Sequence, residues 1–119
     1  MSYVHNNKKP VVLKNDPVDP DGTDWMYFSY GDWLRTSETI VAHEGIVLNG
    51  MVVTDSTYLG AMTDSEGTEF TEVYGVQFTV DSGASTVTVT HRVSTETAGA
   101  VNLGRLNIDH SATLDVKTL

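Results

Sequence analysis

The strongest structural signal in this sequence is an alternation of apolar and polar residues in two consecutive runs within residues 73–93. The apolar parity is made of β-branched and aromatic residues, namely Val76, Phe78 and Val80 in the first run and Val87, Val89 and Val93 in the second. A period of two predicts strands with one buried and one exposed face. The Asp81-Ser82-Gly83-Ala84 segment between them predicts a hairpin turn. Because a lone hairpin is marginal in water, a second sheet must cover its apolar face.

Further strands are expected on both sides of these runs, with turn signals about every 8–12 residues. Residues 24–30 form an aromatic strand candidate, and residues 106–116 form the last one. Asn49-Gly50 is a strong two-residue hairpin signal, which predicts pairing of residues 39–48 with residues 51–54. No long segment has an apolar period of 3.6, so helix is expected to be nearly absent. The pattern predicts an all-β fold, an immunoglobulin-like β-sandwich of about seven or eight strands with an extended N-terminal arm. A small barrel is the alternative.

The N-terminal region differs from the rest of the chain in charge and proline content. Residues 1–14 contain three lysines and no acidic residue, whereas residues 15–119 contain all 16 acidic residues and only four basic ones. Pro17 and Pro20 lack the backbone donors that a central strand needs. We therefore expect residues 1–22 to be an extended basic arm with a proline-rich tether, and residues 23–119 to be the β-sandwich domain.

Composition excludes several classes of function. The chain has 119 residues, enough for one domain, and its net charge of −9 repels nucleic acid and anionic membranes. No cysteine is present, which removes disulfides, thiolate metal sites and cysteine nucleophiles. Neither a secretory signal nor an apolar run of membrane-spanning length is visible. We expect synthesis in the host cytoplasm, with neither nucleic acid nor membrane as a partner.

Catalytic and metal-binding patterns are weak. The acidic segment of residues 19–24 suggests calcium, but the ligand register of an EF-hand fails there, and a solvated tether explains the same residues. There is no Gly-x-Ser-x-Gly elbow and no glycine-rich phosphate loop. We predict a protein that is not an enzyme and that uses no cofactor and no metal.

Two of the four histidines, His91 and His110, stand on the apolar parities of their strands. Buried, hydrogen-bonded histidines are the favoured interpretation; zinc binding and a pH-sensitive contact are the alternatives. If the two strands pair across the connection of residues 95–104, residue 91 lies opposite about residue 107. The two imidazoles are then not direct neighbours.

The aromatic residues near the first predicted strands have two interpretations. Core packing with polar tips at the surface is the favoured one. The alternative is an exposed aromatic contact for sugar rings or for a partner protein, in which Trp33 and Tyr58 are the candidate residues.

Several short motifs resemble those of small virion proteins of tailed bacteriophages that are encoded among the head and head–tail genes. They are Tyr30-Gly31-Asp32-Trp33-Leu34, Glu38-Thr39-Ile40, Val89-Thr90-His91-Arg92-Val93-Ser94-Thr95, Gly104-Arg105 and Thr113-Leu114-Asp115-Val116. The chain departs from that family at Tyr30, where the family has tryptophan, and in a longer connection at residues 96–104. The resemblance implies an immunoglobulin-like fold and a structural role in the particle, with no catalytic residues.

The expected function is that of a capsid decoration or cement protein on the outer surface of the shell of major capsid protein. A homo-oligomer is expected, and a trimer would suit three-fold positions of the shell. In this hypothesis the basic arm binds the partner, and its candidate contact residues are Lys8, Lys9, Val11, Val12, Leu13 and Lys14. The alternatives are a neck or tail component, including a fibre, and a carbohydrate-binding module.

Overall fold

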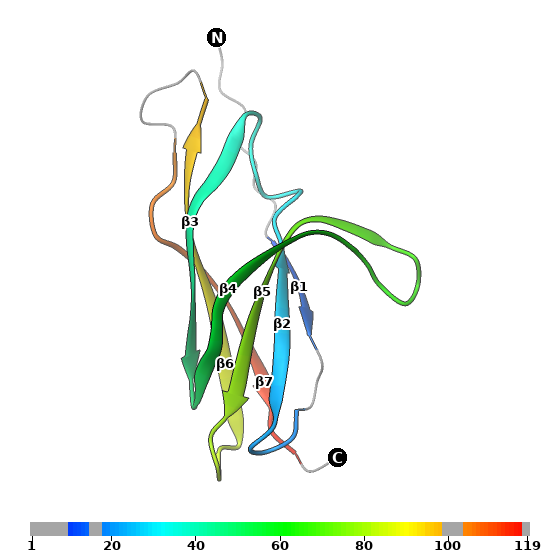
Figure 1. Ribbon diagram of the computed structural model, residues 1–119, viewed down its shortest axis with the longest axis vertical. Coiled ribbons are helices and arrows are strands. Elements are labelled where there is room, and N and C mark those ends of the chain that lie inside the picture. Colours follow the sequence, from blue (N-terminus) through cyan, green and yellow to red (C-terminus); the bar gives the residue numbers. More distant parts are fainter. Residues whose placement is uncertain (1–9, 15–17, 99–103, 118–119) are drawn as a thin grey trace.

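The computed structural model describes residues 10–14, 18–98 and 104–117, and the regular structure in these ranges is entirely β-strand (Figure 1). The strands are β1 (Val11–Lys14), β2 (Thr23–Ser29), β3 (Glu38–Leu48), β4 (Gly50–Thr63), β5 (Glu69–Val80), β6 (Thr86–Thr97) and β7 (Ile108–Asp115). They form two antiparallel sheets, with the orders β1-β2-β5-β4 and β3-β6-β7. The prediction of an all-β fold in two layers is confirmed.

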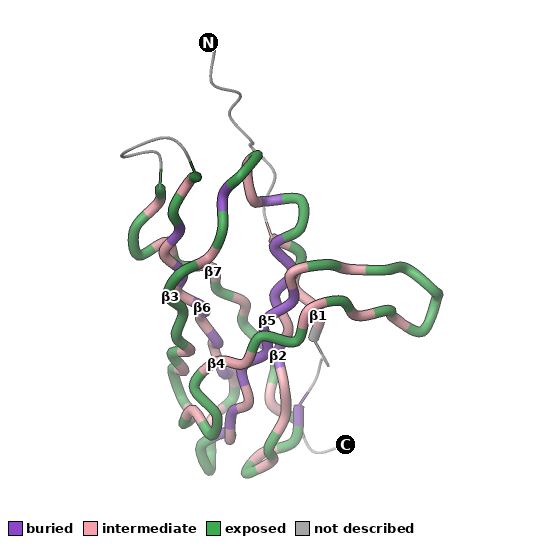
Figure 2. Tube along the Cα trace, turned by 45° about the horizontal axis from the view of Figure 1, so that its top comes forward, coloured by how far each residue is buried: buried purple, intermediate pink, exposed green. Residues whose placement is uncertain are grey.

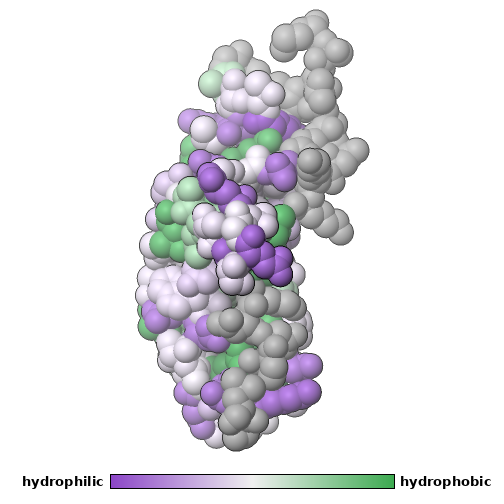
Figure 3. All heavy atoms as spheres, turned by 90° about the vertical axis from the view of Figure 1, so that its right-hand side faces the viewer, coloured by the Kyte–Doolittle hydropathy of each residue, from purple (hydrophilic) through white to green (hydrophobic). Residues whose placement is uncertain are grey.

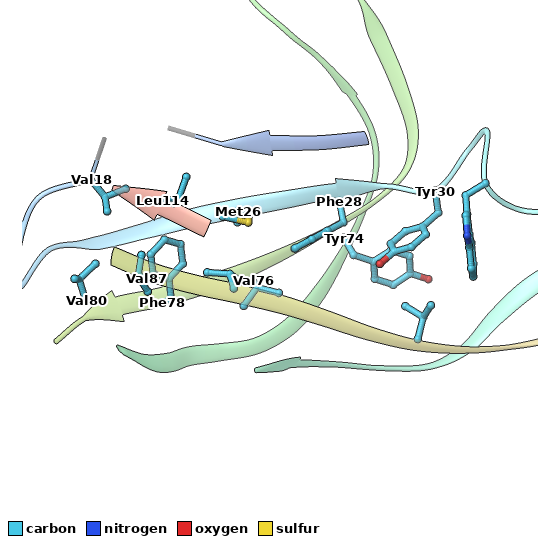
Figure 4. Packing of buried hydrophobic residues seen from close by; sticks show 13 residues of the cluster. Val18, Met26, Phe28, Tyr30, Tyr74, Val76, Phe78, Val80, Val87 and Leu114 are labelled. Atoms are coloured by element: carbon cyan, nitrogen blue, oxygen red, sulfur yellow. The ribbon is translucent and has the colours of Figure 1, made fainter. Parts of the chain in front are cut away.

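The core lies between the two sheets, and the predicted alternation places its side chains. Figure 4 shows them in a row along the interior, from Val18 and Val80 at one end to Tyr74 and Tyr30 at the other. The fully buried side chains on the strands include Met26, Phe28, Val76, Phe78, Val87, Val89, Val93 and Leu114. Each such side chain contributes roughly 1.5–3 kcal/mol through removal of apolar surface from water.

The predicted hairpin between the two alternating runs is wrong. β5 belongs to one sheet and β6 to the other, so residues 81–85 cross between the layers instead of turning within one. The alternation shows which side of each strand faces apolar neighbours, but it is the same for a hairpin and for a crossing. Here the apolar faces of β5 and β6 face each other across the core. Each of the two alternating strands therefore covers the apolar face of the other.

The predicted hairpin at Asn49-Gly50 is also wrong, for a related reason. β3 pairs with β6 and β4 pairs with β5, so this connection also crosses between the sheets. A two-residue type I′ turn needs positive φ at both central residues, and only Asn49 has it, at +65°. The Asn49 carbonyl accepts a hydrogen bond from the Asp81 amide at 3.0 Å, and its side-chain amide donates to the Thr86 carbonyl at 3.2 Å. The two crossings thus stabilise each other.

The predicted boundary between an arm and a domain at residue 22 needs correction. β1 pairs with β2 of the same chain, from Val11 opposite Ser29 to Lys14 opposite Met26. Val18 is buried and forms two backbone hydrogen bonds with the C-terminal strand region. Its amide donates to the Asp115 carbonyl, and its carbonyl accepts from the Lys117 amide. β1 is therefore the outermost strand of this domain's own sheet and not part of a detached arm. Lys8 and Lys9 lie outside the described residues.

The packing of β1 leads to a testable difference between adjacent valines. Val12 faces inward and packs against the core, whereas Val11 is exposed. We expect Val12→Ala to lower the free energy of unfolding by about 1 kcal/mol, through lost apolar contact. Val11→Ala truncates the same type of side chain in the same strand and should lower the free energy of unfolding by less than about 0.5 kcal/mol. Urea denaturation of both variants measures the difference, and equal losses would contradict the inward packing of β1.

A hairpin arm extends from the sandwich where β4 and β5 run beyond their neighbours (Figure 1). We define it as residues 61–70; Figure 2 shows that none of them is buried. Its tip is an ordered turn in which the Asp64 carboxylate accepts hydrogen bonds from the amides of Glu66 and Thr68, both at 2.9 Å. The arm begins within one long strand, β4, whose pairing with β5 is interrupted by several register shifts.

Candidate functional site

Trp33, one of the two proposed surface aromatics, is inside the protein. Its residue is 5% exposed, and its ring meets the rings of Tyr30 and His110 edge-on, with centroid distances of 5.3 and 5.0 Å. The guanidinium carbon of Arg105 lies 3.5 Å from the centroid of the indole ring, a cation–π contact. Core packing, the favoured interpretation, is confirmed for Trp33, and a role as an exposed contact is excluded.

A buried ion pair lies beside this tryptophan. Both carboxylate oxygens of Glu38 accept hydrogen bonds from Arg105, with 2.8 Å between Nε and Oε2, and the Arg105 guanidinium also donates to the Trp33 carbonyl. The Thr95 hydroxyl and the Arg35 amide donate to the same carboxylate. Burial by itself would raise the pKa of Glu38, but the hydrogen bonds from Arg105, Arg35 and Thr95 outweigh it and lower the pKa to about 2. The pair is therefore ionised at neutral pH.

The motifs that resemble the phage family meet at this network. Trp33, Glu38, Thr95 and Arg105 come from four of the matched segments or their ends, and the chain brings them together across up to 72 residues. Their side chains bind one another and not the solvent. At this site the motif residues therefore stabilise the fold, and they do not form an interaction surface.

A second buried polar cluster is centred on His91. Its Nδ1 lies 2.6 Å from the Tyr30 hydroxyl and its Nε2 lies 2.7 Å from the Ser56 hydroxyl, while its ring stacks on Phe28 at 5.3 Å. The prediction of a buried, hydrogen-bonded histidine is confirmed for His91. Since both ring nitrogens already have partners inside the protein, neither is available to a substrate.

The predicted separation of the two histidines is wrong. His91 lies directly opposite His110 in the pairing of β6 with β7, because the connection after β6 continues further than a tight turn and β7 begins only at Ile108. Burial, followed by the nearby His43 and His110, lowers the pKa of His91 to about 3. Burial and then the charge of Arg105 lower the pKa of His110 to about 4. Both imidazoles are therefore neutral at pH 7.

Tyr58, the other proposed surface aromatic, is 52% exposed, and its hydroxyl donates to Glu72 at 3.2 Å. It does not form a platform with Trp33. Instead, ring contacts lead from Tyr58 to Tyr74, to Tyr30 and then to Trp33, with centroid distances of 5.0, 5.8 and 5.3 Å. Tyr58 is at the surface end of this series of rings and Trp33 is at the buried end. Their positions in the sequence do not indicate this difference in exposure.

A group of exposed apolar side chains, which was not among the predicted contact residues, follows strands β3 and β4. We call it the β3–β4 edge, because these strands are the outermost members of the two sheets and follow each other in the chain. Its large side chains are between 37% and 70% exposed: Val41, Ile46, Leu48, Met51 and Val53. Residues 45–54 contain no charged side chain. The signal was present in the sequence, since apolar residues occupy both parities of residues 46–48 and 51–53.

A groove lies on the side from which the hairpin arm extends. It has a volume of about 450 Å³ and is lined by Val12, Leu13, Trp25, Tyr27 and arm residues 62–65. Figure 3 views this side and shows hydrophobic side chains in small groups among hydrophilic ones. We call it the aromatic groove, because the rings of Trp25 and Tyr27 are nearly parallel, 4° apart, with centroids separated by 6.0 Å.

The described residues contain no group of three histidine or acidic side chains placed to hold a metal ion. They also contain no helix long and apolar enough to span a membrane. No protein-family model, curated protein or solved structure matches this chain. The structure thus defines a small two-layer β-sandwich in which buried Glu38 and His91 are hydrogen-bonded, and the β3–β4 edge and the aromatic groove are its candidate binding surfaces.

Proposed function

We propose that this protein is a non-enzymatic structural component of a tailed-bacteriophage particle, and that it docks onto a neighbouring virion protein through the β3–β4 edge. The observation that carries the proposal is the exposed apolar surface of this edge. Large exposed apolar patches on soluble proteins mark interaction surfaces more often than not, and unpaired edge strands offer backbone groups to a partner. The resemblance of the short motifs to phage virion proteins is the reason for proposing a phage particle as the location.

An immunoglobulin-like fold is part of this proposal. The strand orders β1-β2-β5-β4 and β3-β6-β7 correspond one for one to the A-B-E-D and C-F-G sheets of the constant-type immunoglobulin domain. Phe28 on β2 and His91 on β6 stack across the core between the strands that carry the disulfide in antibody domains. This chain has no cysteine, so ring stacking and hydrogen bonds take the place of that cross-link.

Electrostatics favours the β3–β4 edge over the rest of the surface as the docking site. The chain carries a net charge of −9, which opposes close approach to acidic proteins, and the edge segment of residues 45–54 has no charge. A partner that covers this segment therefore desolvates apolar groups without burying an unpaired carboxylate. The hydrogen bonds of Glu38 to Arg105 and of His91 to Tyr30 and Ser56 support a non-enzymatic role, since they engage these buried groups inside the protein.

The first candidate location is the outer surface of the capsid shell, where the partner would be the major capsid protein. There the protein would act as a homo-oligomeric decoration or cement protein. A neck or tail position is the second candidate, because a binding edge and a separate groove suit a component that joins two neighbours. Quantitative mass spectrometry of purified particles separates the two. On the order of hundreds of copies indicates the shell, and about six or twelve indicates the neck or tail.

The docking edge can be tested by placing charge on it. We expect Leu48→Lys/Met51→Lys to weaken binding to particles that lack the protein by about 100-fold or more, because two apolar contacts are lost and two charges are buried. Both side chains are at least 64% exposed, so the fold should be unaffected. Co-sedimentation of the purified protein with particles provides the measurement.

The matched control is Leu106→Lys, which adds the same charge at a leucine that is 76% exposed and lies outside the edge. It should change particle binding by less than about twofold. Undiminished binding of the double variant would refute docking through this edge. Any deletion that tests the N-terminal lysines Lys8 and Lys9 must stop before Val11, since removing residues 11–14 also removes β1.

A further inference from the structure

Two aromatic rings line the aromatic groove, and one of them packs against a glycine. A Cβ atom at Gly75 would come within 2.9 and 3.0 Å of two ring carbons of Trp25, so the indole lies across the backbone of β5 at this position. The Tyr27 ring lies in a nearly parallel plane, 4° away, one step along the same face of β2. The outer face of the sheet therefore carries two adjacent, half-buried aromatic rings in nearly parallel planes.

The hairpin arm lines the rest of the groove with Met62 and three polar residues. Thr63, Asp64 and Ser65 contribute two hydroxyls and a carboxylate. Among the residues that the structure describes, those lining the groove include no lysine, arginine or histidine, so this part of the lining offers no counter-charge to phosphate, sulfate or carboxylate ligands. A volume of about 450 Å³ lies within the range of ordinary small-molecule sites.

We propose that the aromatic groove binds a neutral saccharide chain, which stacks on Trp25 and Tyr27 and forms hydrogen bonds with the hydroxyls and carboxylate of the arm. The face of an aromatic ring carries partial negative charge, which attracts the partly positive C–H groups on the face of a sugar ring. Hydroxyls on the edge of the sugar match the donors and acceptors of residues 63–65. Two rings with centroids 6.0 Å apart provide stacking positions for consecutive sugar units.

An extended peptide is the competing occupant, because β1 is the outermost strand beside the groove. Strand addition reads alternate side chains in separate pockets. Here the groove is lined by two neighbouring parallel rings, of which Trp25 packs on Gly75, and such ring faces suit the faces of sugar rings better than alternating side chains. The geometry therefore favours the saccharide. The saccharide site is separate from the β3–β4 edge and does not depend on the docking proposal.

The test is a glycan array that carries neutral oligosaccharides of glucose, galactose and N-acetylglucosamine, incubated with the full chain. A hit is then titrated while tryptophan fluorescence is recorded, because one of the two tryptophans, Trp25, lines the groove and the other is buried. We expect Trp25→Ala to weaken binding at least about tenfold, the size of effect that loss of one stacking partner produces. Tyr58→Ala, which removes an exposed aromatic outside the groove, should leave it within about twofold.

A second variant tests the groove in case Trp25→Ala fails to fold. Ser65→Arg enlarges an exposed side chain at the mouth of the groove and should also abolish saccharide binding, while the thermal melt stays unchanged. A silent array with folded protein would overturn the proposal. So would binding of a synthetic peptide of residues 1–9 that is lost in Trp25→Ala, since the groove would then be a peptide site. Particle binding through the β3–β4 edge should survive both substitutions, so failure of one proposal does not imply failure of the other.

Discussion

Arg105→Ala is expected to lower the free energy of unfolding by about 3–5 kcal/mol, the largest loss that we predict for a single substitution. The Glu38 carboxylate is fully buried, and both of its oxygens accept hydrogen bonds from Arg105. Removing the arginine leaves a charge inside the protein without its counter-ion and removes the guanidinium that packs on Trp33. Equilibrium urea denaturation, monitored by tryptophan fluorescence, measures the loss.

Arg92→Ala is the matched control. Arg92 also forms a bidentate ion pair with Asp109, with 2.7 Å from Nε to Oδ1 and 3.1 Å from Nη2 to Oδ2. The Arg92 side chain, however, is 37% exposed and that of Asp109 is 44% exposed. Water screens this pair, so its loss should destabilise the protein far less than the loss of Arg105. Glu38→Met/Arg105→Met should recover much of the stability lost in Arg105→Ala, because no unpaired charge stays buried. Equal losses for Arg92→Ala and Arg105→Ala would contradict the assigned roles.

Acidification from pH 7 to pH 5 is expected to destabilise the protein by about 2 kcal/mol through His91. Burial lowers the pKa of His91 in the folded state from 6.5 to about 3, so the unfolded chain binds the proton more readily. Stability is therefore complete above pH 6.5 and declines as the pH falls from 6.5 towards 3. The lowered pKa of His110, about 4, acts in the same direction. Urea denaturation at a series of pH values records this decline.

His91→Gln isolates the contribution of this residue. The variant should be less stable at pH 7, since it loses the fit to Tyr30 and Ser56, but its stability should change less between pH 7 and pH 5. Glu38 does not contribute in this window. Its pKa is lowered from 4.5 to about 2, so its stabilisation is present above pH 4.5 and is lost only as the pH falls further. An unchanged pH dependence in His91→Gln would show that other groups control it.

Strand identity was predictable because it depends on neighbouring residues along the chain. The parity of Val76, Phe78 and Val80 indicated the inward face of β5, and the same reasoning placed the core residues of β6. Sheet membership was not predictable in this way. A short polar connection between two alternating strands is compatible with a hairpin and with a crossing, and both connections that we assigned to hairpins proved to be crossings.

The candidate sites were predicted less well than the strands. Trp33 and Tyr58 were identified as aromatic contacts, yet the first is buried and the second is separated from it by two rings. Trp25 and Tyr27 share a parity, and this signal could have identified the outward face of β2. The groove above them needs the hairpin arm, which comes from residues nearly 40 positions away, and no local pattern predicts that approach.

The sequence alone determined that this protein is an all-strand, acidic, cysteine-free domain, and it determined which side of most strands faces inward. These properties follow from composition and from a two-residue period, both of which are local. The tertiary structure alone decided that β1 belongs to the sandwich, that Arg105 packs between Glu38 and Trp33, and that the hairpin arm lines the same groove as Trp25. The physical reason is that each of these contacts joins segments distant in sequence, and their arrangement is selected by the burial of the whole core.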